Sequence, residues 1–265
     1  MSDFSHGQKL YLKRLRRHHR IVILSRILIL IVFLILWEVA ADTGVIDSFI
    51  FSSPSRVAKC FWEMVMDKTI FLHMGITLYE IIVSFLLVTF ISILFAVLLW
   101  YSHKLSEILD PYLVVLNSLP KSALAPLLIV WLGATQTTII VAGMSVAIFG
   151  SILSLYTSFS SVDQEKIKLI YTLNGTRRHA LTKVILPGSV PVIISNMKVN
   201  IGLCLVGVVI GEFLAARNGL GYLIIYSSQV FKLDWLLMSI VILCIMAMLL
   251  YQCIAFLEKW CQKKF

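Results

Sequence analysis

The long apolar runs of the sequence limit which folds are open to this chain. Six runs are long enough, at roughly 20 residues each, to cross the apolar layer of a bilayer as helices. They lie at 21–41, 75–101, 109–132, 136–158, 188–212 and 234–257. Hydrophobic residues make up 59% of the chain and charged residues 14%, whereas a soluble domain carries about 25% charged residues. The sequence therefore predicts an all-α, polytopic membrane helix bundle of about six spans.

Basic residues are distributed unevenly between the predicted spans. If the N-terminus is inside, the inner segments 1–20, 102–108, 159–187 and 258–265 hold 15 Lys and Arg, against five in the outer segments. Such an excess is typical of the cytoplasmic side. We therefore predict cytoplasmic termini, with a basic leader at 1–20, a transmembrane domain at 21–257 and a tail at 258–265. The net charge of +9 comes from these flanks and does not indicate nucleic-acid binding.

The third run is interrupted by prolines and polar side chains. They are Pro111, Asn117, Ser118, Pro120, Lys121, Ser122 and Pro126. Proline removes a backbone donor and clashes with the preceding helical turn. Because a broken backbone persists within a membrane only where protein or water satisfies it, we expect this segment to face the protein interior or a pathway.

Several charged residues lie within or near the ends of the spans. Lys198 is expected either to line a path for an anion or to extend its amine to the inner surface. Glu212 is expected to serve a gate or helix packing, whereas Glu38 and Glu80 are interpreted as interfacial. Together with Lys121, Lys198 and Glu212 are the candidate residues of a translocation pathway.

Residue types that carry catalysis or bind metals form no recognisable set in this sequence. The cysteines have no C-x-x-C spacing, which predicts small buried apolar side chains rather than a disulfide framework or a zinc site. They are Cys60, Cys204, Cys244, Cys253 and Cys261. No phosphate-binding loop with a Gly-Lys followed by Ser or Thr occurs. The chain is therefore predicted to be no enzyme, to need no cofactor or metal, and to leave ATP to another subunit.

The outer segment 42–74 contains a predicted surface helix. Ser53 and Pro54 are typical of a helix start. Apolar residues then recur at helical spacing, at Val57, Phe61, Met64 and Val65. We expect a short amphipathic helix at the outer surface.

The inner segment 159–187 carries the strongest functional pattern. A helix is predicted over 163–173, with Ile167, Ile170 and Tyr171 on one face at i, i+3, i+4 spacing. Such a partly apolar face is expected to bind in a groove of a partner protein.

The same segment is predicted to fold as a hairpin. Asn174 and Gly175 are expected to stop the first helix, because both tolerate the left-handed conformation. A second short helix is then predicted to run toward Pro187. Basic residues in this part, Arg177, Arg178 and Lys183, either contact the partner or only mark the inner side.

This hairpin resembles the cytoplasmic coupling motif of permease subunits in bacterial ATP-binding-cassette (ABC) importers. The motif reads Glu-Ala-Ala, three residues, Gly, nine residues, Ile, one residue, Leu-Pro. Val184–Pro187 matches its end, which places Asn174 at the family glycine and Lys168–Ile170 at Glu-Ala-Ala. Lys168 reverses the charge of the family's acid, whereas Asn174 tolerates the same backbone conformation. The resemblance implies that an ATPase contacts Lys168, Leu169, Ile170, Asn174, Gly175, Thr176, Arg177, Leu186 and Pro187.

Other segments resemble the nitrate, sulfonate and taurine group of these permeases. They are Leu116–Gly133, Gly207–Phe213, Asn218–Ile224 and Ser52–Ser55, and the similarity covers roughly residues 50–257. The resemblance implies a type I ABC importer permease fold in the bacterial cytoplasmic membrane. It also implies as partners an ATP-binding subunit dimer, a second permease copy or paralogue, and an extracytoplasmic substrate-binding protein.

The expected function is translocation of a small solute of the sulfonate, taurine or nitrate class. One alternative is the same role for a thiamine-precursor pyrimidine or a riboflavin-like molecule. Another is a secondary transporter driven by an ion gradient, which would often show inverted repeats and paired intramembrane acids. Neither is visible in the sequence. A structural scaffold would leave the proline-broken third run unexplained.

Overall fold

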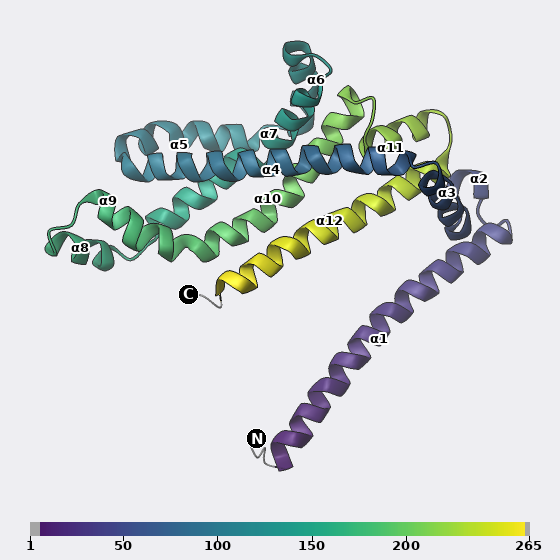
Figure 1. Ribbon diagram of the computed structural model, residues 1–265, viewed down its shortest axis with the longest axis horizontal. Coiled ribbons are helices and arrows are strands. Elements are labelled where there is room, and N and C mark those ends of the chain that lie inside the picture. Colours follow the sequence, from purple (N-terminus) through teal and green to yellow (C-terminus); the bar gives the residue numbers. More distant parts are fainter. Residues whose placement is uncertain (1–5, 263–265) are drawn as a thin grey trace.

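The computed structural model describes residues 6–262 of the chain, and this part is helical without any strand. Its helices are α1 (His6–Asp42), α2 (Ser48–Phe51), α3 (Pro54–Met66), α4 (Thr69–Tyr101), α5 (His103–Ser118), α6 (Lys121–Leu132), α7 (Gln136–Ser160), α8 (Gln164–Thr172), α9 (Arg177–Ala180), the π-helical turn η1 (Leu181–Ile185), α10 (Leu186–Ala215), α11 (Leu220–Gln229) and α12 (Leu233–Gln262). Helices α4, α7, α10 and α12 form the bundle, from which α1 diverges (Figure 1). The predicted all-α class is confirmed.

The helices account for five or six membrane spans in the described residues. Five are long and apolar enough to cross a bilayer, and a sixth results if α5 and α6 count as one span. The axes of α5 and α6 differ by 97°, and Figure 1 shows α6 projecting from the bundle. Only Pro120 marks this break, because Pro111 and Pro126 lie inside α5 and α6. One proline of the three therefore interrupts the third run.

Two predicted boundaries differ most from the structure. Helix α1 continues back to His6, so the described part of the basic leader is helical. The fifth span begins at Arg177 rather than at residue 188, because α9, η1 and α10 form one continuous helical segment. The predicted second short helix is thus the start of this span. Pro187 lies in the first turn of α10, directly after η1, and the wide turn relieves the usual clash of a proline ring.

Small residues let the central helices approach one another closely. A Cβ on Gly207 of α10 would lie 2.8 Å from the Cα of Gly143 on α7. A Cβ on Gly143 would lie 2.7 Å from the Oγ of Ser84 on α4, whose hydroxyl donates to the Ile140 carbonyl over 3.1 Å. Close backbone packing and hydrogen bonds between helices replace the hydrophobic driving force that lipid does not supply.

Helix α3 confirms the predicted amphipathic element. Its N-cap is Ser53 and Pro54 occupies the first turn, as Pro prefers. Glu38 at the end of α1 accepts a 2.9 Å hydrogen bond from the Ser55 amide. Arg56 forms a 3.0 Å ion pair with Asp234 of α12. The N-terminal helix and α12 are therefore both tied to α3.

The cysteines only partly match their expected environment. Cys60 and Cys204 are buried, whereas Cys244 and Cys253 are exposed on α12. Burial raises the pKa of the Cys60 thiol to about 11, which keeps it unreactive. The side chain of Cys261 lies outside the described residues.

The two ends of the bundle differ in what they carry (Figure 1). At one end, which we name the coupling end, α8 and α9 lie beside the turn between α4 and α5. At the opposite end lie α2, α3 and the start of α11. This arrangement brings the predicted coupling residues to one end and Glu212 to the other.

Candidate functional site

The first arm of the coupling segment is a short helix with defined ends. Asp163 is the N-cap of α8, and its carboxylate accepts a 2.9 Å hydrogen bond from the Glu165 amide. After Leu173 the chain reverses at Asn174, whose φ is 63°. The Asn174 amide donates to the Tyr171 carbonyl over 3.0 Å, and the Gly175 amide donates to the Ile170 carbonyl over 2.8 Å. These two bonds form a Schellman motif.

Asn174 and Gly175 stop the helix for different reasons. Asn174 adopts the left-handed conformation that the sequence predicts for it, at the position of the family glycine. The helix stops at these two residues as expected, but Gly175 does not have a positive φ, so the reason expected for it is wrong. It lacks room for a side chain, because a Cβ would lie 2.7 Å from the Ile170 carbonyl oxygen. Glycine is therefore required at 175 by close approach rather than by backbone conformation.

The apolar face of α8 points toward its own chain. Ile167 is 7% exposed and packs in a cluster with Phe159 of α7 and Ile185 of η1, and Ile170 packs against the same cluster. Leu169 and Leu173 are 58% and 72% exposed. The prediction that this face binds a partner is wrong for Ile167 and Ile170, whereas Tyr171, the third residue of the predicted face, is 46% exposed. The i, i+3, i+4 pattern marks burial, and here it marks burial within the permease itself.

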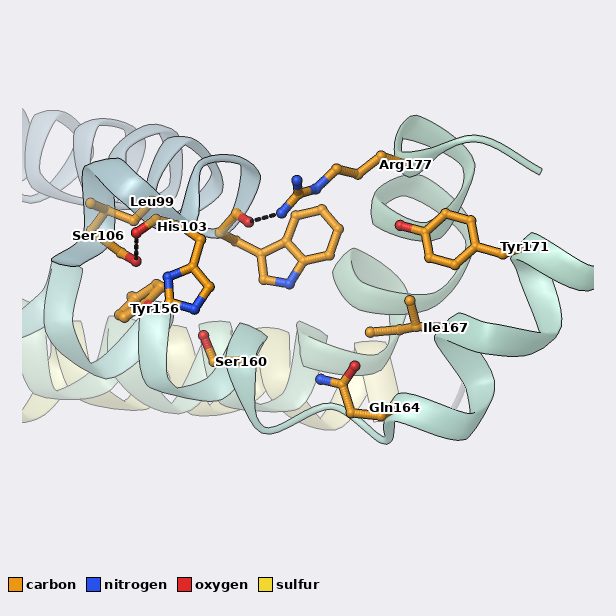
Figure 2. Close-up of a pocket in the computed structure, with 10 residues that line it drawn as sticks. Leu99, His103, Ser106, Tyr156, Ser160, Gln164, Ile167, Tyr171 and Arg177 are labelled. Atoms are coloured by element: carbon orange, nitrogen blue, oxygen red, sulfur yellow. Dashed lines mark hydrogen bonds between the residues drawn. The ribbon is translucent and has the colours of Figure 1, made fainter.

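The second arm is anchored to the end of α4. The Arg177 guanidinium donates a 3.0 Å hydrogen bond to the Trp100 carbonyl. It also lies over the rings of Trp100 and Tyr101, at 5.1 and 5.3 Å from their centroids. Figure 2 shows Arg177 reaching across the gap to α4. A planar guanidinium suits this combined stacking and hydrogen bonding.

A cavity of about 400 Å³ separates α8 from the α4–α5 turn. Gln164, Ile167 and Tyr171 border it on the α8 side, and His103 and Tyr156 face them from α5 and α7 (Figure 2). The Ile167 cluster packs α8 against its own bundle, and Arg177 at the start of α9 attaches the second arm to α4.

The remaining predicted coupling residues follow along the second arm. The Thr176 amide donates to Nδ1 of His179 over 3.0 Å, which closes the first turn of α9. Leu186 packs against the Ile167 cluster, whereas Pro187 is exposed. Lys168 is exposed on α8, and Arg178 and Lys183 are exposed on α9 and η1.

The three candidate pathway residues do not come together. Lys198 of α10 forms an ion pair with Glu258 of α12, and the two side chains are 19% and 21% exposed. Glu258 is the first residue of the predicted cytoplasmic tail, so the amine is directed toward the predicted inner side. Lys121 donates to the last carbonyls of α5, at Leu116 and Asn117. It therefore caps the broken end of that helix.

Glu212 and Glu80 are buried near the opposite end of the bundle. Their exposed fractions are 0% and 1%. The interfacial interpretation of Glu80 is wrong, because α4 begins at Thr69 rather than at residue 75, which places Glu80 about three turns inside the helix. The acids lie on α4 and α10, far apart in sequence, so no local spacing could have paired them. The Trp100 anchor of Arg177 was missed for the same reason.

Residues 88–265 match the family described as binding-protein-dependent transport system inner membrane component. The chain is 29% identical to a probable ABC transporter permease protein of Haemophilus influenzae, over 88% of this chain and 94% of that protein. It is 28% identical to the taurine transport system permease protein of Escherichia coli, over 83% and 82%. It is 25% identical to a putative aliphatic sulfonates transport permease protein of Bacillus subtilis, over 86% and 83%.

A solved structure shows the same fold. A chain from inward-facing conformations of the MetNI methionine ABC transporter aligns with a TM-score of 0.60, at 15% identity, over 76% of this chain and 97% of that one. The expected type I ABC importer permease fold is confirmed. The chain belongs to the family of inner membrane components of binding-protein-dependent transport systems, and its similar relatives include sulfonate, taurine and nitrate permeases.

Proposed function

We propose that this permease imports a small anion of the sulfonate, taurine or nitrate class and takes its energy from a separate ATPase at the coupling end. The observation that carries the coupling role is the build of α8. It is capped at both ends, fastened to its own bundle by Ile167, and leaves Leu169 and Leu173 exposed. Two exposed leucines one turn apart suit an apolar groove on a partner.

The partner must supply the nucleotide site. The sequence has no phosphate-binding loop, so ATP is hydrolysed by an ATP-binding subunit dimer. A second permease copy or paralogue and an extracytoplasmic binding protein complete the importer. The coupling end is cytoplasmic, with both termini on that side.

In this mechanism α8 works as a rigid connection. When the two ATP-binding subunits close, each carries its α8 with it. The Ile167 cluster and the Arg177 anchor pass the displacement to α4, α7 and α10, which rock as rigid bodies. Gly175 keeps the turn between the arms tight, so that α8 does not move alone.

The substrate class rests on the relatives. The taurine and sulfonate permeases support an anion. Relatives named for formylaminopyrimidine and riboflavin transport, at 23% and 26% identity, support the second candidate, a pyrimidine or riboflavin-like substrate. Among the pathway candidates, Lys121 lies at the break between α5 and α6. A break of this kind favours a position beside a water-filled path. Lys198 and Glu212 act by holding helices together.

A double variant, Leu169→Asp with Leu173→Asp, tests the coupling role. The tagged chain is purified from membranes of its own host, and ATPase activity and co-purifying proteins with a phosphate-binding loop are measured. We expect the wild type to retain such a subunit and the variant to lose it. Val45→Asp, an equally apolar and 78% exposed site at the opposite end, serves as the control. Retention of the ATPase by the double variant would contradict the proposal.

Uptake measurements identify the substrate class. A host lacking this chain is compared with the complemented strain for uptake of labelled taurine, an alkanesulfonate, nitrate, a formylaminopyrimidine and riboflavin. Restored uptake of one of the anions supports the proposal. Restored uptake of only the pyrimidine or riboflavin establishes the second candidate instead.

A further inference from the structure

Helix α4 presents three polar side chains to the junction of α10 and α11. They are His73, Thr77 and Glu80, spaced at i, i+4 and i+7, which places them on one helix face. Nδ1 of His73 accepts a 3.0 Å hydrogen bond from the Gly219 amide. Oγ1 of Thr77 accepts a 2.8 Å hydrogen bond from the Leu220 amide. The turn before α11 is thus bonded to α4 through two backbone amides.

Glu212 of α10 completes this arrangement from the other side. Its carboxylate accepts a 2.6 Å hydrogen bond from the Thr77 hydroxyl and a further bond from the amide of Gly221. This amide belongs to the first turn of α11, where backbone donors are otherwise unsatisfied and a negative charge is favoured. Glu212 therefore has hydrogen-bond donors for a charged carboxylate in a fully buried place.

Two glycines make room for this carboxylate. A Cβ on Gly219, whose φ is 122°, would lie 2.5 Å from the Glu212 carboxyl carbon. A Cβ on Gly221 would lie 2.7 Å from its Oε2. The segment Gly219-Leu220-Gly221 therefore fits around the Glu212 side chain.

Glu80 lies beside the same carboxylate but has a different environment. It is one turn beyond Thr77 on the same face of α4 and is 1% exposed, and its Oε2 is buried without any partner. No Lys or Arg in the described residues forms an ion pair with either acid. A hydrogen bond between two carboxyl groups needs one proton, and two uncompensated buried charges in contact are strongly unfavourable. Glu212 has the donors that stabilise a charge, so the proton belongs on Glu80.

Titratable or charged residues also lie near the pair. In the described structure they are His73 on α4, Tyr222 on α11 and Arg217 in the turn between α10 and α11. Arg217 lines a cavity of about 300 Å³ together with Glu80 and the neutral Gln136 of α7, but it forms no ion pair with either acid.

We infer that Glu80 and Glu212 form a proton-binding site, in which a proton on Glu80 is shared with the charged Glu212, and that the occupied site fastens residues 219–222 to α4. Loss of the proton would set two negative charges against each other and separate α4 from α10 at this end. The site is a property of the permease chain, independent of its substrate and of the ATPase.

Infrared spectroscopy of the purified full-length chain in lipid vesicles tests the inference. A protonated carboxylic acid has a carbonyl absorption distinct from that of a carboxylate, and its proton exchanges with deuterium. We expect wild type to show this absorption in neutral buffer, with a shift in D₂O, and Glu80→Gln to lose it. Glu38→Gln, which alters an acid bonded to Ser53 and Ser55, should keep it. Absence from wild type, or persistence in Glu80→Gln, would overturn the inference.

Amide hydrogen exchange tests the fastening role and does not depend on the acid signal. Thr77→Val keeps the shape of the side chain but removes the hydroxyl that joins Leu220 to Glu212. We expect exchange at residues 219–222 to become about tenfold faster. Thr89→Val removes a hydroxyl on the same helix that has no partner, and should leave this exchange unchanged. Equal exchange in Thr77→Val and Thr89→Val would also overturn the inference. If Glu80→Gln does not fold, the wild-type D₂O shift and this pair of variants still decide the question.

Discussion

The two ends of the bundle differ in how a turn that follows a helix is attached to α4. At the coupling end the attachment is Arg177, which bonds to and stacks on Trp100 from an exposed position beside a cavity of about 400 Å³. At the opposite end the attachment is Glu212, fully buried and surrounded by Thr77 and two glycines.

The exposed attachment at one end and the buried attachment at the other suit the two ends to different roles. The coupling end keeps apolar residues such as Leu173 exposed and its anchor accessible to water, as a surface that receives a partner would. The opposite end satisfies buried polar groups within the chain, so that its stability depends on every member of the network. Substitutions at the opposite end should therefore affect folding, whereas those at the coupling end should affect coupling.

The largest effect is expected for Gly219→Ala at the opposite end. The new methyl group would meet the Glu212 carboxyl at a φ of 122°, which a side chain rarely adopts. We expect a loss of about 3 kcal/mol of unfolding free energy, measured by denaturant titration in mixed micelles. Gly202→Ala, which has open space around it, is the control and should change stability little. Comparable stability of the two variants would show that the glycine fit is not needed.

Gly175→Ala should have the next largest effect, at the coupling end. Its Cβ would meet the Ile170 carbonyl oxygen at 2.7 Å, so the Schellman bond must open at a cost of about 2 kcal/mol. Because the turn is exposed, we expect the bundle to stay folded while uptake falls relative to ATP hydrolysis. Gly188→Ala, with nothing within 4 Å, should retain the wild-type ratio. The comparison between the ends fails if Gly175→Ala unfolds the whole chain.

Thr77→Val, at the opposite end, should lower the unfolding free energy by less than the two glycine substitutions. It leaves the Leu220 amide and one Glu212 oxygen without a bond, at a cost of about 1.5 kcal/mol in unfolding free energy. Thr89→Val is the matched control, since its hydroxyl has no partner. The prediction is contradicted if Thr77→Val is as stable as Thr89→Val in the same titration.

Arg177→Lys should have the smallest effect on stability. Lysine keeps the charge but loses the planar stacking on Trp100 and Tyr101. We expect a loss of about 1 kcal/mol or less in unfolding free energy, with a larger fall in transport per ATP hydrolysed. Arg178→Lys, exposed one residue further on, is the control. Equal transport per ATP hydrolysed in the two lysine variants would show that the attachment of Arg177 to α4 is not needed for coupling.

Patterns that depend on neighbouring residues were predicted correctly. Ser53 and Pro54 start α3, the helix predicted over 163–173 is present as α8, and Asn174 takes the left-handed conformation. Each of these features is decided within a few residues, because caps and turns satisfy nearby backbone groups. The break at Pro120 was also foreseen, although the two other prolines fit inside their helices.

Predictions that depended on which partner a side chain meets were often wrong or incomplete. Ile167 and Ile170 have the spacing of a buried face, but the sequence does not say whether the burial is within the chain or in a partner. The sequence shows no paired intramembrane acids, which disfavours a secondary transporter. The structure nevertheless buries Glu80 and Glu212 at the same end of the bundle. Family membership, not that absence, establishes the ABC permease.

The sequence by itself determined the apolar spans, the local caps and turns and the family motif, because these follow from the free energy of apolar residues in lipid and from local backbone bonding. The tertiary structure alone decided that Lys198 meets Glu258, that Arg177 meets Trp100 and that Glu80 and Glu212 are both buried at one end of the bundle. Such pairs join helices far apart in the chain, and their energy depends on distance and burial, which exist only once the helices have packed.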